Sequence, residues 1–277
     1  MRSARSNDTT LPNFFITDMT DISSLTFTDL ETYIKSLGEP AFRAKQIYAW
    51  LSRGVMTFDG MTDLSKPLRE KLHANCTLAA LELRRRLVDP EDGTAKYLFA
   101  LSDGLLIETV VMKYKHGNSV CISSQAGCRM GCRFCASTLL GKERDLTAGE
   151  MLAQVAFANA DVGVTNVVVM GVGEPLDNFD NLCVFLENLH DPRGLNISHR
   201  HVSVSTCGIV PKIYELAEKR LQITLSVSLH APDDETRSQI MPINSAYNVE
   251  TLMKACDAYV AATNRRISSE YTLIKGV

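Results

Sequence analysis

Residues 165–175 read TNVVVMGVGEP, an apolar run that ends in two glycines, a glutamate and a proline. An unbroken run of this kind is typical of a strand that is buried on both faces of a sheet. The amphipathic segment LTAGEMLAQVAFANA (146–160) precedes it, and Thr147 with Glu150 resembles a helix-capping box. The two segments therefore predict a helix that leads into a buried strand, the repeating unit of parallel α/β folds.

The alternation of helix and strand continues to the last residue. The other predicted segments are strands near 118–124, 201–208, 222–232 and 268–277, and helices over 181–190, 210–220 and 249–264. With the strand at 165–175, they predict five strands in right-handed βαβ units, which form a parallel sheet.

Three predicted regions precede this α/β series. Residues 1–24 are polar and aperiodic and predict a disordered leader, which lacks the apolar core of a signal peptide. Residues 25–79 carry three helical patterns and predict a small helical domain. Residues 80–117 predict a β-hairpin extension, because the turn signals DPEDG, SDG and KHGN interrupt their apolar runs. Its strands are expected near 81–88, 95–101 and 105–113.

Composition narrows the class of protein. The chain has 277 residues, 45% of them hydrophobic, and a net charge of −3, so any RNA-binding surface must be a local patch. No apolar run approaches the roughly 20 residues that span a bilayer, so we expect no membrane association. Eight cysteines without an export signal indicate reduced thiols and a cytoplasmic protein.

Three cysteines follow the strand at 118–124 in a C-x3-C-x2-C pattern: Cys128, Cys132 and Cys135. Three thiolates would leave one iron of a [4Fe–4S] cluster open to a ligand. A structural zinc site requires a fourth ligand, commonly from a second cysteine pair, and no such pair follows. The spacing therefore favours a cluster, with zinc as the alternative.

Glycines and polar residues also follow the other predicted strands. They are Gly171, Gly173 and Glu174 after the second strand, Ser205 after the third, and Ser228 and His230 after the fourth. Taken alone, glycines after a strand are more often turn residues than ligand contacts, and a lone serine or histidine there is as readily one as the other. Because ligands bind at the carboxyl edge of parallel strands, their coincidence with the cysteine loop predicts one common site.

Several long motifs resemble a single family. VCISSQAGCRMGCRFCAS, VVVMGVGEPLDN, VSTCGIVP and SLHAPDDETRSQIMPIN, with Phe134 before the last cysteine, resemble the radical S-adenosylmethionine (SAM) RNA adenine methyltransferases, particularly their dual-specificity adenine-C2 branch. The similarity runs from about residue 27 to the last residue. It implies a partial (β/α)6 TIM-like barrel over 118–277, truncated after its fifth strand, and RNA contacts for the helical N-terminal domain.

The resemblance also implies a role for each matching residue. Cys128, Cys132 and Cys135 would hold a [4Fe–4S] cluster whose open iron binds SAM, and SAM cleavage would give a 5′-deoxyadenosyl radical. Glu108 matches a proton acceptor, and Cys121 matches a cysteine that helps to release the RNA adduct by forming a disulfide. Contacts to SAM are implied for Gly173, Glu174, Ser205, Ser228, Leu229 and His230.

The implied reaction is methylation of C2 of an adenine in 23S rRNA and in the anticodon loop of tRNA. It uses two SAM molecules per turnover, a methyl-cysteine intermediate and an electron donor such as flavodoxin. The target base must be splayed out to reach the site. Two alternatives are an adenine-C8 rRNA methyltransferase of the same family and a non-catalytic iron–sulfur or RNA-binding fragment.

Some of these residues have simpler interpretations. Without the resemblance, Glu108 is an exposed strand carboxylate, and Cys121 is a small buried apolar residue. Four basic residues near the cysteine loop either meet RNA phosphate or form a solvated charged surface: Arg129, Arg133, Lys142 and Arg144.

The chain departs from the family at its end, since it stops at Val277 before the segment that carries the methyl-accepting cysteine. Cys183 and Cys256 lie in predicted helices and Cys207 lacks the matching context, so no methyl carrier is assigned. We expect a fifth strand with an unpaired edge, and a 277-residue form that binds the cluster and SAM without transferring a methyl group.

Overall fold

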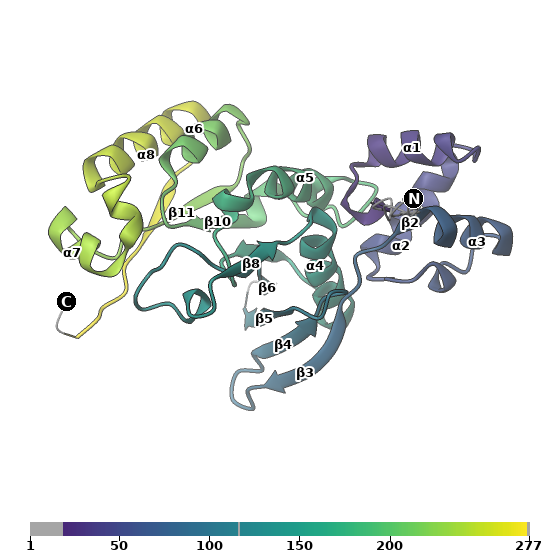
Figure 1. Cartoon of the computed structure of the whole chain (residues 1–277), viewed down its shortest axis with the longest axis horizontal. Helices are drawn as coiled ribbons and strands as arrows, with labels where there is room; N and C mark the ends of the chain where they lie inside the picture. The colour runs from purple at the N-terminus through teal and green to yellow at the C-terminus, as the bar shows by residue number, and fades with distance from the viewer. Residues whose placement is uncertain (1–18, 116, 276–277) are drawn as a thin grey trace, which may run out of the picture.

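The computed structural model describes residues 19–115 and 117–275. Its centre is one eight-stranded sheet in the order β12-β11-β10-β9-β6-β5-β4-β3 (Figure 1). The parallel strands are β6 (Gly117–Ile122), β9 (Asn166–Val169), β10 (Val202–Thr206), β11 (Thr224–Ser228) and β12 (Ile267–Glu270). The sheet does not close, so the prediction of an α/β fold with a partial barrel of five parallel strands is confirmed.

Three antiparallel strands extend the same sheet beyond β6. They are β3 (Glu82–Val88), β4 (Ala95–Ala100) and β5 (Leu106–Tyr114). β3 forms one edge of the sheet and β12 the other. The region predicted as a β-hairpin extension is therefore continuous with the barrel sheet, and its strands share the two faces of that sheet.

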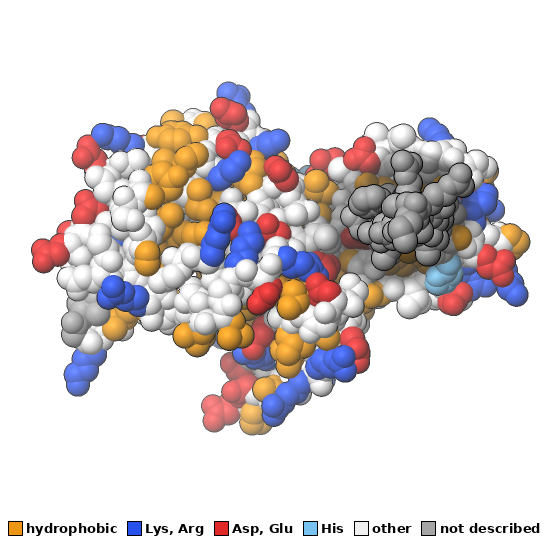
Figure 2. Space-filling view, in the orientation of Figure 1, with side chains coloured by type: hydrophobic (Ala, Val, Ile, Leu, Met, Phe, Trp, Pro, Cys, Tyr) orange, Lys and Arg blue, Asp and Glu red, His pale blue; other side chains and the backbone are white. Residues whose placement is uncertain are grey.

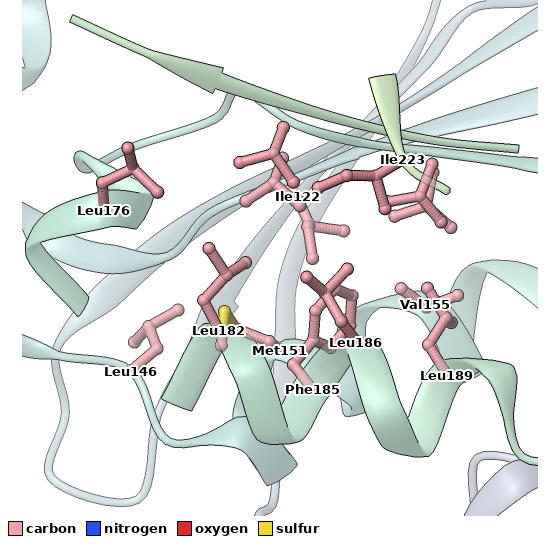
Figure 3. Packing of buried hydrophobic residues seen from close by; sticks show 14 of the residues in the cluster. Ile122, Leu146, Met151, Val155, Leu176, Leu182, Phe185, Leu186, Leu189 and Ile223 are labelled. Carbon is pink, nitrogen blue, oxygen red and sulfur yellow. The ribbon is translucent and has the colours of Figure 1, made fainter. Parts of the chain in front are cut away.

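Five helices connect the parallel strands, and four of them cover one face of the sheet. They are α4 (Ala148–Val162), α5 (Phe179–His190), α6 (Val210–Glu218), α7 (Asp234–Ile240) and α8 (Val249–Thr263), of which α7 lies at the carboxyl edge, where Ile240 packs with Cys132, and the other four cover the face. Apolar strand residues such as Val120, Val167 and Leu225 pack against them and are fully buried. Figure 3 shows the helix side of this core, where Leu182 and Leu186 of α5 point toward the sheet.

The opposite face of the sheet carries small and polar side chains. The strand register places Cys121 beside Val168, Ser205 beside Ser226, and Ser228 beside Glu270. Neighbouring residues in register share a face. The face away from the helices is therefore polar, and its side chains are available to line a site.

The N-terminal domain is built from α1 (Phe27–Ser36), α2 (Phe42–Ser52) and α3 (Lys66–Asn75). It has its own apolar core and packs on α4 and α5 through polar contacts as well. The Tyr48 hydroxyl donates to Asn188 Oδ1 of α5 at 3.2 Å, and Asn188 Nδ2 donates to the Leu25 carbonyl at 2.9 Å. The domain is thus fixed to the barrel by a buried amide.

Three sequence predictions need correction. Residues 1–18 of the predicted leader lie outside the described residues, but Thr20–Asp21 (β1) pairs with Cys76–Thr77 (β2), and the Ile22 side chain is fully buried. The prediction of disorder is therefore wrong for residues 20–24. The last strand ends at Glu270 rather than at Val277, because the register pairs it with β11 only to that residue. The helix α7 was not predicted.

No helix of the described residues is long and apolar enough to cross a lipid bilayer.

We expect Asn188→Ala to lower the free energy of unfolding by about 1–3 kcal/mol, because it leaves buried hydrogen-bonding groups of Tyr48 and Leu25 with fewer partners. Urea unfolding followed by circular dichroism measures the change. Glu187→Ala, an exposed substitution on the same helix, is the control and should stay within about 0.5 kcal/mol. Equal effects of both substitutions would contradict the assigned role of Asn188.

Candidate active site

A cavity of about 230 Å³ opens at the carboxyl edge of the parallel strands. The residues that line it come from the cysteine loop and from the ends of β9, β10, β11 and β12. Those that were predicted from the sequence are Cys128, Cys132, Cys135, Gly171, Gly173, Glu174, Ser205, Ser228 and His230. The structure therefore brings most of the candidate site residues to one place.

A short antiparallel hairpin holds the two ends of the cysteine loop together. Its strands are β7 (Gln125–Gly127) and β8 (Lys142–Asp145), and the Cys128 amide donates to the Gly141 carbonyl at 3.0 Å. Gly127 has φ +77°, and a Cβ atom there would lie 1.9 Å from the Gly141 oxygen. The chain can approach this closely only with glycine, so Gly127 fixes where the loop begins.

The loop thiols are partly withdrawn from water. Cys128 and Cys132 are buried, and desolvation raises the pKa of both, that of Cys132 to about 11. Without a bound cation, these thiols are therefore protonated near neutral pH. Metal binding requires thiolates and would release these protons.

The donor set can be compared with the requirements of a multi-iron cluster and of a single zinc ion. Among residues 19–115 and 117–275, no three histidine, cysteine or acidic side chains are arranged around a point where one metal ion could bind. A [4Fe–4S] cluster spreads its three cysteine ligands over three separate irons, and all three loop thiols line the same cavity. The three thiols are thus compatible with the predicted cluster, and its preference over zinc stays a prediction at this point.

Glu174 is a buried carboxylate on the cavity wall. It accepts hydrogen bonds from Thr206 Oγ1 at 2.7 Å, the Cys207 amide at 2.8 Å and the Leu176 amide at 3.0 Å. Burial raises the pKa of this carboxyl group. No lysine, arginine or histidine of the described residues pairs with it, so the site could accept a cationic group from a ligand.

Gly173 precedes this glutamate and has φ +109°. A Cβ atom here would lie 2.6 Å from the Cβ of Gln125. The Gln125 side chain also accepts from the Glu174 amide at 2.9 Å. Close approach of these two segments therefore requires glycine at this position, and it sets the position of the Glu174 backbone.

Two serines at the strand ends share a carboxylate that the sequence analysis missed. The hydroxyls of Ser205 and Ser228 each lie 3.2 Å from Glu270 Oε2, and Glu270 lines the cavity. Glu270 of β12 lies in register with Ser228 of β11. The alternation of the last predicted strand could have placed it on this face, but only once the register with β11 was known.

His230 lines the cavity with an unusual backbone, at φ +55°. Its Nδ1 atom accepts from the Thr272 amide at 3.1 Å, and its ring packs edge-on against Phe134. Burial lowers the pKa of the imidazole. The neutral ring therefore carries its proton on Nε2. The neighbouring Leu229 side chain packs against the apolar core and does not line the cavity.

Glu108 and Cys121 lie outside the cavity, on the polar face of the sheet. Glu108 of β5 forms an ion pair with Lys96 at 2.6 Å. Cys121 of β6 lies opposite Val110, so the two site candidates are diagonal neighbours on adjacent strands. Burial raises the pKa of Cys121. All eight cysteines are free thiols, so the disulfide implied for Cys121 is not formed in this structure.

Three of the four basic residues that could have met phosphate are held by carboxylates instead. Arg129 and Lys142 bind Asp177, and Arg144 binds Asp103 and Glu150. These ion pairs fix the cysteine loop and the adjoining β8 strand. Arg133 is exposed and has no ion pair among the described residues.

Gly127→Ala tests the role of the hairpin in cluster binding. We expect a loss of stability greater than that of Gly141→Ala, because both glycines have φ near +75° but only Gly127 would collide with backbone. We also expect iron content after anaerobic reconstitution to fall well below the roughly 4 atoms that one [4Fe–4S] cluster requires. Urea unfolding and iron analysis measure the two effects, and equal behaviour of the variants would contradict the proposed constraint.

Comparison with known proteins places this geometry in a family. The sequence matches the radical SAM superfamily over residues 122–277 and the N-terminal domain of ribosomal RNA large subunit methyltransferases over residues 17–78. A relative from Lachnospira eligens, named probable dual-specificity RNA methyltransferase RlmN, is 56% identical over 262 residues, which cover 94% of this chain and 75% of the relative. A protein of the same name from Thermoanaerobacter sp. (strain X514) is 50% identical, with coverage of 94% and 76%.

A solved structure agrees with these matches. A radical SAM methyltransferase from Sphaerobacter thermophilus superimposes with a TM-score of 0.88 at 42% identity, covering 93% of this chain and 77% of that one. Membership of the radical SAM superfamily implies a [4Fe–4S] cluster and SAM as cofactors, which the cavity and its three thiols can accommodate. The chain therefore belongs to the radical SAM superfamily and, within it, to the RlmN family of RNA methyltransferases.

Proposed function

We propose that this active site serves methylation of C2 of an adenine in 23S rRNA and in the anticodon loop of tRNA, in the cytoplasm, with SAM as methyl donor and a methyl-cysteine intermediate. Because no cysteine of the chain is assigned that role, we expect the 277-residue form to bind the cluster and SAM without transferring a methyl group. The observation that carries the proposal is the joint placement of three loop thiols and the cation-free carboxylate of Glu174 on one cavity. Relatives at 50–56% identity that bear the name of dual-specificity RNA methyltransferases support the same reaction.

Cys128, Cys132 and Cys135 would each ligate one iron of the cluster and leave the fourth iron open to SAM. When bound, the cluster supplies the electron that cleaves SAM. Glu174 would bind the ammonium group of the methionine moiety, because a buried carboxylate without a cation gains most from such a partner. Gly173 lines the same cavity, so its backbone could contact the methionine moiety beside Glu174.

The remaining cofactor contacts would come from the strand ends. Ser205 and Ser228 present hydroxyls that Glu270 orients. His230 would donate from Nε2, because the Thr272 amide already occupies Nδ1. Leu229 would contribute through its backbone, since its side chain packs into the core.

Glu108 and Cys121 would act on the RNA rather than on SAM. C2 of adenine is unactivated toward polar methyl transfer, so the reaction would use one SAM for the methyl group and one for a radical. Glu108 would accept the proton that leaves C2, and Cys121 would help to release the RNA adduct. We assign no methyl-carrying cysteine. Cys183 and Cys256 do not line the cavity, and Cys207, which does line it, lacks the matching sequence context. A flavodoxin-type protein would deliver electrons.

Anaerobic reconstitution with iron, sulfide, dithionite and SAM tests the proposal. We expect about 4 irons per chain, as one such cluster requires, and release of 5′-deoxyadenosine detected by mass spectrometry. Glu174→Gln should keep the iron but weaken SAM binding by about tenfold or more, because a charged hydrogen bond is lost. Glu235→Gln on the exposed side of α7 is the matched control.

Full iron loading without any 5′-deoxyadenosine would overturn the radical reaction. The position of the methyl group is read separately, from the nucleosides of RNA that the protein has modified. Recovery of 2-methyladenosine would contradict the expected lack of methyl transfer, and recovery of 8-methyladenosine would in addition assign the chain to adenine-C8 methylation.

A further inference from the structure

We propose that a groove on β3, β4 and β5 binds the phosphate backbone of the substrate RNA, with Arg85 and Lys96 as its cations. The groove has a volume of about 150 Å³ and is lined by Arg85, Leu87, Lys96, Leu98 and Glu108. We call it the β3–β5 groove. The inference rests on the proposed function, which makes RNA the substrate, and adds the path that the RNA takes to the cavity.

The edge strand β3 is exposed to solvent along its whole length. All seven of its residues are exposed, including the apolar Leu87 at 47%. Charged residues on an edge strand prevent aggregation, which alone would explain the arginines. That explanation does not account for the adjoining groove, in which apolar and cationic side chains lie together. Figure 2 shows basic and hydrophobic side chains side by side over the β3–β4 ribbon, at the bottom of the view.

The groove lies on the same face of the sheet as the active site. Arg85 is in register with Leu98, and Leu98 with Glu108, so all three side chains share this face. Leu87 and Lys96 are the next pair on it. Combined cations and apolar surface are the features with which proteins hold single-stranded nucleic acid.

The cations of the groove are available to a ligand. Arg84 and Arg86 pair with Glu82 and Asp161, whereas Arg85 has no ion pair within the described part of the chain. Lys96 pairs only with Glu108, and both side chains are nearly half exposed, so solvent screens the pair and a phosphate can replace the carboxylate.

One hydroxyl joins the groove to the cavity. The Ser123 side chain donates to the Glu108 carbonyl at 2.7 Å and accepts from the Val172 amide at 3.1 Å. Val172 lies between Gly171 and Gly173, which both line the cavity. The groove and the strands that end at the cavity also share one face of the sheet, so an RNA strand in the groove can continue toward the site where its target base is needed.

The arrangement gives Lys96 two competing partners. Without RNA, Lys96 binds Glu108, and with RNA it binds phosphate. RNA binding would therefore release Glu108, the proton acceptor of the proposed reaction, only when substrate is in place.

The dependence of RNA affinity on salt tests the groove. The probe is a fluorescent RNA hairpin with an adenosine in its single-stranded loop, titrated with the reconstituted protein at several KCl concentrations. We expect Arg85→Ala and Lys96→Ala each to reduce the slope of log Kd against log salt by about 0.7, the value for one lost contact to single-stranded phosphate. Lys254→Ala, an exposed lysine with an i,i+4 partner on α8, is the control and should leave the slope unchanged. Circular dichroism confirms that the variants fold.

A second pair of variants tests the competition for Lys96. Glu108→Gln should tighten RNA binding severalfold in the wild-type background, and by less in the Lys96→Ala background, because the competitor matters only while Lys96 is present. Weaker binding by Glu108→Gln would overturn the competition.

The outcomes separate this inference from the proposed function. Wild-type affinity and salt slope in the Arg85→Ala, Lys96→Ala double variant would overturn the groove while leaving RNA methylation in place. A wild-type protein that binds no hairpin and releases no 5′-deoxyadenosine would overturn the proposed function itself.

Discussion

The backbone of Cys207 is held between two buried charges of opposite sign, and the carboxyl edge of the sheet depends on this arrangement. The Cys207 amide donates to Glu174, and its carbonyl accepts from Arg237 Nη2 at 2.7 Å. Arg237 also donates to the Leu229 and Ser228 carbonyls. One carboxylate and one guanidinium thus tie the ends of β9, β10 and β11 together.

Burying two ions is favourable only when hydrogen bonds replace the lost water. Arg237 is 1% exposed and donates to neutral acceptors, while Glu174 accepts from neutral donors. The two side chains therefore bind the amide and the carbonyl of Cys207 and do not pair directly with each other. This leaves the ligand-facing side of Glu174 without a cation, which is the property that the site uses.

The sequence predicted the parts of the fold that depend on local patterns. The apolar strand before Gly171 and the capping box of Thr147 and Glu150 are present as predicted. The helix α7 was missed because its segment DETRSQI is polar and short, and is held by the buried Arg237 rather than by an apolar stripe.

The site itself was predictable only in part. The cysteines, Glu174 and the two serines could be predicted as site residues because they come at or directly after the ends of predicted parallel strands. Glu270 depends on the register of β12 with β11, which no local pattern contains. The side chain of Leu229 packs against the core, although its neighbours Ser228 and His230 line the cavity. The backbone changes direction at His230, where φ is +55°, and no local pattern predicts that change.

Charge distribution explains why Arg129, Lys142 and Arg144, unlike the exposed Arg133, are poor candidates for RNA contacts. Asp177 is almost fully buried, with a 7% exposed side chain, and binds both Arg129 and Lys142. The Lys142–Asp177 pair is mostly buried on both sides, and salt screens such a pair less than an exposed one, so it holds the loop under conditions in which RNA binding weakens. A protein with a net charge of −3 must then attract RNA through cations that lack strong internal partners. The exposed pair of Lys96 and Glu108, together with the unpaired Arg85, meets that requirement on the same face as the active site.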